Sequence, residues 1–460
     1  MIRRDVHADS IRPHLMNVSF GAIPLPSLGR RQRPLSWLQN CCVTYLALWA
    51  TAPPLAFSPV SRYLAVLAIF FWFIAECSRS RGVVRRPTVS VCILFLYFVY
   101  TSLGILIFEG VSILNADIQL YIMLIFILFM QSRRREIESM EPTFWMLLLT
   151  FPVWQILTIK EILTSNTHAA RILIRSSTEA ADLMGRGVGG YSLVYASLLL
   201  FPSVLVLFLN PKAVDGRKLL RPFRYFPFAS RIIIIGNTLS ALVLVIVSGY
   251  SIAAISIVVV TFSVLFIRNY SPYNIVCCML LTVCCYVVFY VYIEQILLWL
   301  LPLTHGSNFN LKIRDILISM QEDSASGTLY DRIERYQRSF LLFVQNPIFG
   351  TMSSTDIGKH SQILDNFAQF GIVVGSMFVY LLITVPVMYI KRRGAEFGLA
   401  FAMLIVTLLY FGLNNAFMSA GPVLFIIFPV AANMIRSFQC WKPRRSVATT
   451  ESQVSILHQR

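Results

Sequence analysis

Long apolar runs dominate this chain and recur from one end to the other. Twelve of them have, or come close to, the length that a helix needs to cross a membrane. They cover about residues 37–57, 62–77, 88–108, 118–131, 143–160, 190–210, 232–248, 251–267, 275–303, 366–390, 397–413 and 418–436. No stretch between them is long enough to form a soluble core. The pattern therefore predicts an all-α polytopic membrane protein with about twelve transmembrane helices.

Polar segments divide the remainder. We expect a polar cytoplasmic extension over residues 1–34, a transmembrane domain over 35–436 and a cytoplasmic tail over 437–460. Only two loops of substantial length, about 161–189 and 304–366, are predicted on the outer side of the membrane. No internal repeat is visible, which weakens the common transporter architectures.

The second outer loop has the pattern of an amphipathic helix. Thr328 is a candidate N-cap, and Asn346-Pro347 ends the pattern because proline cannot continue a helix. Its apolar positions are Ile333, Phe340, Leu341 and Val344. The first outer loop instead ends in Gly185-Arg-Gly-Val-Gly-Gly-Tyr191, which predicts a turn into the next span. A phosphate-binding loop would need a preceding strand and a lysine that this segment lacks.

Composition and charge support this topology. The chain is 57% hydrophobic and carries a net charge of +17. Its basic clusters lie near residues 3–33, 79–86, 133–135, 212–224, 391–393 and 442–445, all on one side of the membrane if there are twelve spans. Basic loops mark the cytoplasmic side, so they indicate orientation rather than a nucleic-acid surface.

The sequence favours chemistry without a metal ion or another cofactor. All nine cysteines fall in spans or on the cytoplasmic side, and no cysteine and histidine spacing suits zinc. Metal-dependent transferases of lipid-linked sugars place acidic residues in the first outer loop. Here that loop, about residues 53–62, contains none. Glu294 is the one clear acid at membrane depth, where an ionisable group is a functional candidate.

Arginines in the two outer loops are the candidates for binding phosphate groups, because guanidinium binds phosphate oxygens in pairs. They are Arg171, Arg175 and Arg186 in the first loop and Arg332, Arg335 and Arg338 in the second. On the predicted helix, Asp331 precedes Arg335 by four residues, and Glu334 precedes Arg338 by four. Such spacing allows ion pairs within the helix. Arg332 has no partner at that spacing, so it is the first choice for an anionic ligand.

His360 is the candidate general base, because a histidine titrates near neutral pH. Asp365, five residues later, could orient the histidine or a bound hydroxyl group. A purely structural histidine is the competing interpretation.

These residues resemble the Wzy-type polysaccharide repeat-unit polymerases, relatives of the O-antigen ligases. The resemblance rests on Arg332 with Tyr336, on Asn346-Pro-Ile-Phe-Gly350, on His360-Ser361, and on Phe370-Gly371. In the first outer loop it rests on Arg171 ahead of Gly187-Val-Gly-Gly-Tyr191 and Tyr195. Loop placement extends the likeness over most of the chain.

The resemblance implies a glycosyltransferase of the bacterial inner membrane with a periplasmic site. It would join oligosaccharides carried on undecaprenyl pyrophosphate into O-antigen, capsule or exopolysaccharide, beside a flippase and a chain-length regulator. Arg171 and Arg332 would hold the pyrophosphate, and His360 would act on the acceptor hydroxyl. Arg175, Arg335, Arg338, Asp365 and Tyr336 would have supporting roles in binding the substrate. An O-antigen ligase acting on lipid A core is the nearest alternative, and a flippase or transporter belongs to a different class.

Overall fold

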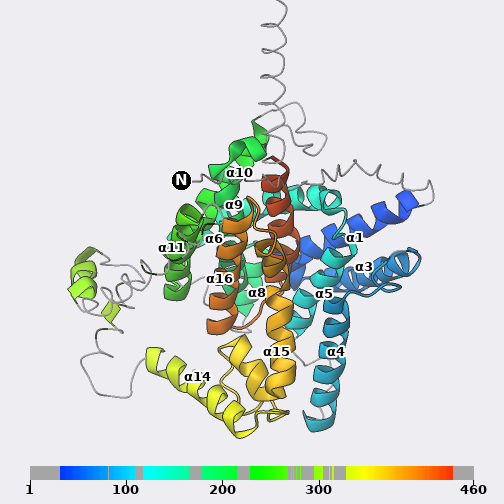
Figure 1. Cartoon of the computed structure of the whole chain (residues 1–460). Helices are drawn as coiled ribbons and strands as arrows, with labels where there is room; N and C mark the ends of the chain where they lie inside the picture. The colour runs from blue at the N-terminus through cyan, green and yellow to red at the C-terminus, as the bar shows by residue number, and fades with distance from the viewer. Residues whose placement is uncertain are drawn as a thin grey trace, which may run out of the picture.

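The computed structural model describes residues 32–80, 82–109, 118–164, 178–214, 228–267, 295–303 and 328–438. It also describes the single residues 173, 271, 273, 276, 280, 310, 313, 314 and 317. Every regular element in this part of the chain is a helix, and no strand occurs in it (Figure 1). The predicted all-α class is confirmed for these residues.

Seven helices within the described residues are long and apolar enough to cross a membrane. They are α3 (Pro59–Cys77), α4 (Val89–Gly104, extended to Phe108), α6 (Glu141–Thr164, preceded by Ile137–Met140), α9 (Tyr191–Leu209), α10 (Ala229–Val247), α15 (Gln362–Ile390) and the C-terminal helix Ala420–Phe438, whose first turn is α17 (Ala420–Pro422). Three apolar helices are shorter: α5 (Ile118–Ser132), α11 (Ser251–Phe266) and α16 (Phe397–Leu413). Helix length and hydropathy thus make the chain a multi-pass membrane protein.

The first predicted span differs from the observed helices. Helix α1 begins at Gln32, inside the segment that was expected to be a polar extension, and it ends at Thr51. Pro53 and Pro54 then start a separate short helix, α2 (Pro53–Phe57). The reason is local, since proline has no N–H with which to continue the hydrogen-bond ladder of α1. Most of the predicted span 275–303 lies outside the described residues.

Helix α9 forms the centre of the bundle. Almost its whole length is buried, and it packs against α10, α11 and α16. Its leucine and valine residues face neighbours on every side, as expected for a helix without a polar face. The helix Ala420–Phe438 is buried to a similar extent and packs beside α9 and α5. These two helices form the core around which the others are arranged.

A buried polar cluster ties together one end of the bundle. The Glu76 carboxylate, at the end of α3, accepts hydrogen bonds from Gln39 Nε2 at 2.6 Å and Ser132 Oγ at 2.9 Å. Arg79 forms an ion pair with it at 3.6 Å. Arg133 donates to Gln39 Oε1 at 3.1 Å and to the Ser36 hydroxyl at 3.0 Å. Two basic segments that the sequence placed on the same side of the membrane therefore meet at one end of the protein.

Candidate functional site

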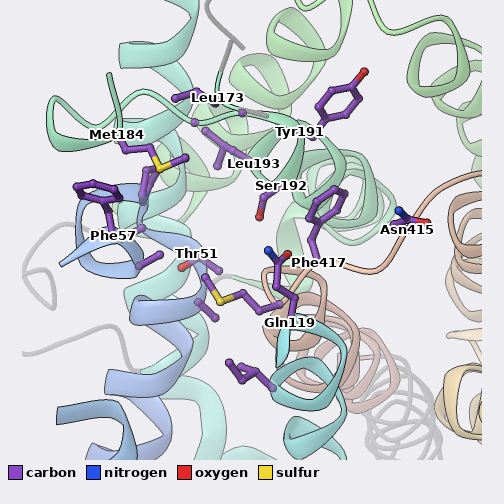
Figure 2. Close-up of a pocket in the computed structure, with 18 of the residues that line it drawn as sticks. Thr51, Phe57, Gln119, Leu173, Met184, Tyr191, Ser192, Leu193, Asn415 and Phe417 are labelled. Carbon is purple, nitrogen blue, oxygen red and sulfur yellow. The ribbon is translucent and has the colours of Figure 1, made fainter. Parts of the chain in front are cut away.

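A cavity of about 830 Å³ lies at the end of the bundle away from these basic segments. The ends of α1 and α16 and the starts of α3, α5 and α9 supply its walls. In Figure 2, Phe57 and Met184 lie on one side of it, and Asn415 and Phe417 lie on the other. Most of its lining is apolar, including Leu173, Leu193, Met418 and several alanines. Its volume is in the range of about 300–1,000 Å³ that is usual for small-molecule sites.

Three basic side chains line this largely apolar cavity. Arg332 and His360 come from the second outer loop, and Arg62 comes from the first turn of α3. The structure thus brings together the two residues of this loop that the sequence ranked highest. Sequence reasoning missed Arg62. The signal is present in the sequence, because the predicted outer loop 53–62 contains an arginine, the residue type that also marks the other two outer loops.

Helix α14 (Thr328–Gln345) presents Arg332 to the cavity, and its observed bounds confirm the predicted amphipathic helix. Tyr336, one turn after Arg332, donates a hydrogen bond from its hydroxyl to the Leu413 carbonyl oxygen at 3.0 Å. Phe343, on the same face, packs edge-on against Phe367 of α15 with ring centroids 5.3 Å apart. Tyr336 therefore fastens the helix against the end of α16, and this contact fixes the position of Arg332.

The charged residues of α14 pair only partly as predicted. Arg338 Nη2 lies 2.9 Å from Glu334 Oε1, so this pair is confirmed. The expected pair of Asp331 with Arg335 does not form. Arg332 has no ion pair with any residue that the structure describes. Arg335 and Arg338 do not line the cavity.

Asp365 positions the loop that carries His360. Its buried carboxylate accepts a hydrogen bond from the Ser339 hydroxyl at 2.6 Å and from the Ser361 backbone N–H at 3.3 Å. Ser339 Oγ in turn accepts from the Gly358 N–H at 2.9 Å. These bonds hold the loop before α15 against α14. Asp365 thus acts on the backbone around His360.

Close packing explains the glycine at position 358. A β-carbon there would collide with the carbonyl oxygen of Arg335, so only glycine allows this loop to approach α14. On its other side, Asn415 Nδ2 donates to the Lys359 carbonyl oxygen at 2.8 Å. The loop that bears His360 is therefore fixed between α14 and the segment after α16.

The motif at residues 346–350 joins the end of α14 to α15. The Ile372 N–H donates to the Pro347 carbonyl oxygen at 2.8 Å, and the Thr351 N–H donates to the Ala368 carbonyl oxygen at 2.9 Å. Gly371 has a φ of 74°, a conformation that glycine adopts without strain, and a β-carbon there would collide with Ile348. These motif residues are therefore structural: they set the angle between α14 and α15.

The surroundings of His360 favour its neutral form. Partial burial lowers its pKa below the ordinary value, and the positive charges of Arg335 and Arg332 lower the pKa further. Asp331 acts in the opposite direction. A neutral imidazole beside an arginine can accept a proton from a bound hydroxyl group.

The other predicted site residues have different outcomes. Arg171, Arg175 and Glu294 lie outside the described residues. Arg186 forms ion pairs with Asp182 at 3.1 Å and with Glu161 at 3.6 Å. The predicted glycine turn is present: Gly187 has a φ of 87°, and the Gly189 N–H donates to Thr158 Oγ1 at 2.8 Å.

Among the described residues, no group of three or more histidine, cysteine, aspartate or glutamate side chains is placed to hold a metal ion. The sequence matches no protein-family model and no curated protein.

Proposed function

We propose that this protein is a glycosyltransferase that polymerises oligosaccharide units carried on undecaprenyl pyrophosphate. One observation carries the proposal: Arg332, Arg62 and His360 line the same largely apolar cavity at the end of a membrane bundle. Such a cavity suits a ligand that combines an anionic group, hydroxyl groups and a lipid. The residues that resemble the Wzy-type polymerases support the same assignment.

The reaction assigns a separate task to each basic side chain. The acceptor sugar hydroxyl attacks the anomeric carbon of the donor, and the bond from that carbon to the pyrophosphate oxygen breaks with inversion. The leaving lipid pyrophosphate gains negative charge, which Arg332 and Arg62 stabilise from fixed positions. The neutral imidazole of His360 takes the proton of the attacking hydroxyl. A pyrophosphate needs little protonation to depart, so no separate acid is required.

The proposed location is the periplasmic face of the bacterial inner membrane. Helices α1, α3, α5, α9 and α16 line the cavity with the ends that lie away from the basic loops, and basic loops favour the cytoplasm. The product would be O-antigen, capsule or exopolysaccharide. A flippase that delivers the lipid-linked units and a chain-length regulator are the proposed partners.

A ligase that transfers finished glycan to lipid A core is the second candidate, because it would use the same donor and the same basic residues. Deleting the gene in its native host separates the two. Loss of a polymerase leaves single units on the core lipid, whereas loss of a ligase leaves polymer on its carrier. A flippase would move labelled lipid-linked units across sealed vesicles without changing the length of the glycan.

The proposed mechanism predicts activity in the presence of EDTA. Fixed arginines, rather than a divalent cation, would neutralise the pyrophosphate, so removing metals should leave the rate nearly unchanged. The measurement is glycan length after incubating purified protein with synthetic lipid-linked units, with and without EDTA. A strict requirement for added magnesium or manganese would place the protein in the metal-dependent class of transferases.

The rate of polymerisation should fall on the acidic side of the pH profile. Because the pKa of His360 is lowered, its neutral form persists below the ordinary histidine range and is lost as the pH falls through that pKa. Arg335→Gln removes a cation that lowers the pKa, so it should shift the acidic limb to higher pH. Asp331→Asn removes an anion that raises the pKa, so it should shift the limb to lower pH.

Initial rates of the three proteins across the pH range measure these shifts. An acidic limb that stays in place in both variants would show that His360 is not the titrating group.

A further inference from the structure

Helix α14 has an apolar face that no described part of the protein covers. Its members are Ile333, Phe340, Leu341 and Val344, followed by Ile348 and Phe349 in the next turn, and they are between 44% and 65% exposed. At 100° per residue, the four helical members fall on one side of the helix, which we name the apolar stripe of α14. The packed side, with Arg332, Tyr336 and Ser339, is a different face. The apolar positions that mark this helix in the sequence are therefore not the ones that contact the bundle.

A third face of α14, distinct from the apolar stripe and from the packed face, is polar and rich in arginine. Glu334, Arg335 and Arg338 are exposed there. A helix with large apolar side chains on one face and arginines on another is typical of helices that lie in the interface of a membrane. The long stems of the arginines allow their charged ends to reach the headgroups while the apolar face is buried.

The apolar stripe is continuous with the surface of a predicted membrane span. The turn with Ile348 and Phe349 is held to α15 by the hydrogen bond from the Ile372 N–H to the Pro347 carbonyl oxygen. Ile372 and Val373 of α15 are themselves about half exposed, on a helix long and apolar enough to span a membrane. In Figure 1, α14 extends sideways from α15 near the end of the bundle that α4 also reaches. Exposed apolar side chains thus run from the outer side of α15 onto α14.

We propose that the apolar stripe of α14 lies in the leaflet of the lipid bilayer on the side of the cavity. Interfacial helices bury their apolar face about 5–10 Å into the boundary between headgroups and acyl chains. The packed face of α14 then holds Arg332 near the depth of the lipid phosphates. A ligand that carries its phosphate at that depth would meet the cavity without leaving the membrane. This placement does not depend on the proposed glycosyl transfer.

Fluorescence quenching in lipid tests the placement. A small fluorescent amino acid, excited beyond the tryptophan range, replaces Val344 in one full-length protein and Gln345 in another. Gln345 is the matched control, because it is the next residue, is exposed and lies toward the polar face. Both proteins are reconstituted in phosphatidylethanolamine and phosphatidylglycerol vesicles, with acyl chains brominated close to the headgroup or unbrominated. Because both positions are exposed, the substitutions should leave the fold intact, and gel filtration checks this.

The probe at position 344 should lose most of its fluorescence in brominated vesicles and resist aqueous iodide. The probe at 345 should lose less to brominated lipid and more to iodide. Iodide quenching at both positions, without lipid quenching at 344, would overturn the proposal by showing that the stripe faces water. Shielding of position 344 from both quenchers would overturn it in favour of a protein cover, whether another segment of this chain, a second copy or another partner.

Discussion

Replacing Arg332 by alanine should reduce polymer formation by about 10²–10³-fold, the usual loss when one fixed group that stabilises a developing anion is removed. Arg332 lines the cavity and has no ion pair among the described residues, so its charge is available to a ligand. The loss should appear in the rate with saturating substrate. It should also weaken binding of the lipid-pyrophosphate donor, because the donor carries the same charge.

The matched control is Arg338→Ala, on the same helix. Arg338 is paired with Glu334 at 2.9 Å, is about half exposed, and does not line the cavity. Its removal should cost only a weak surface ion pair, so activity and membrane accumulation should stay close to those of the unaltered protein. Both variants are compared by glycan length in vitro at equal protein amounts. Equal activity of Arg332→Ala and Arg338→Ala would reject the assignment of Arg332 to the pyrophosphate.

Replacing His360 by alanine should reduce the rate of elongation by about 10²–10⁴-fold, the usual contribution of a general base. Binding of the lipid-pyrophosphate donor should persist, since Arg332 and Arg62 are unchanged. His360→Gln should retain a trace of activity, because an amide oxygen accepts a hydrogen bond from the acceptor hydroxyl without taking its proton. Donor binding and elongation are measured separately on the purified variants.

The loop around His360 provides the structural check. Asp365, Ser339 and Gly358 hold its backbone through hydrogen bonds that do not involve the imidazole. The alanine variant should therefore fold normally, and its thermal unfolding should match that of the unaltered protein. Normal elongation by His360→Ala would make the histidine structural, and the base would then have to be sought at Glu294, because Asp365 is buried and already bonded to Ser339 and Ser361.

The sequence by itself determined the class of the fold. Runs of apolar residues of spanning length leave little choice, because in lipid the backbone must satisfy its hydrogen bonds within each segment. The basic clusters predicted which helix ends lie on the same side of the membrane. The contacts of Arg79 and Arg133 around Glu76 agree with this prediction. Helix α14 was also predictable, since its apolar period and its terminal Asn346-Pro347 are local signals.

Only the tertiary structure decided which side chains share the cavity. Arg62 and Arg332 are separated by most of the chain, and no local pattern states that the start of α3 faces α14. The predicted pairing of Asp331 with Arg335 failed for a related reason. Spacing makes an ion pair available within a helix, but it does not ensure that the two side chains meet.

The orientation of α14 is the clearest example of a feature that the local sequence pattern does not determine. The spacing of its apolar residues predicts an amphipathic helix. That spacing does not determine whether the apolar face contacts protein or lipid. Tyr336, Ser339 and Phe343, rather than the apolar stripe, attach the helix to α15 and α16. Hydrophobic burial has no preferred direction, whereas hydrogen bonds between particular partners do. The sequence therefore determined that the helix forms, and those directional contacts determined where it lies.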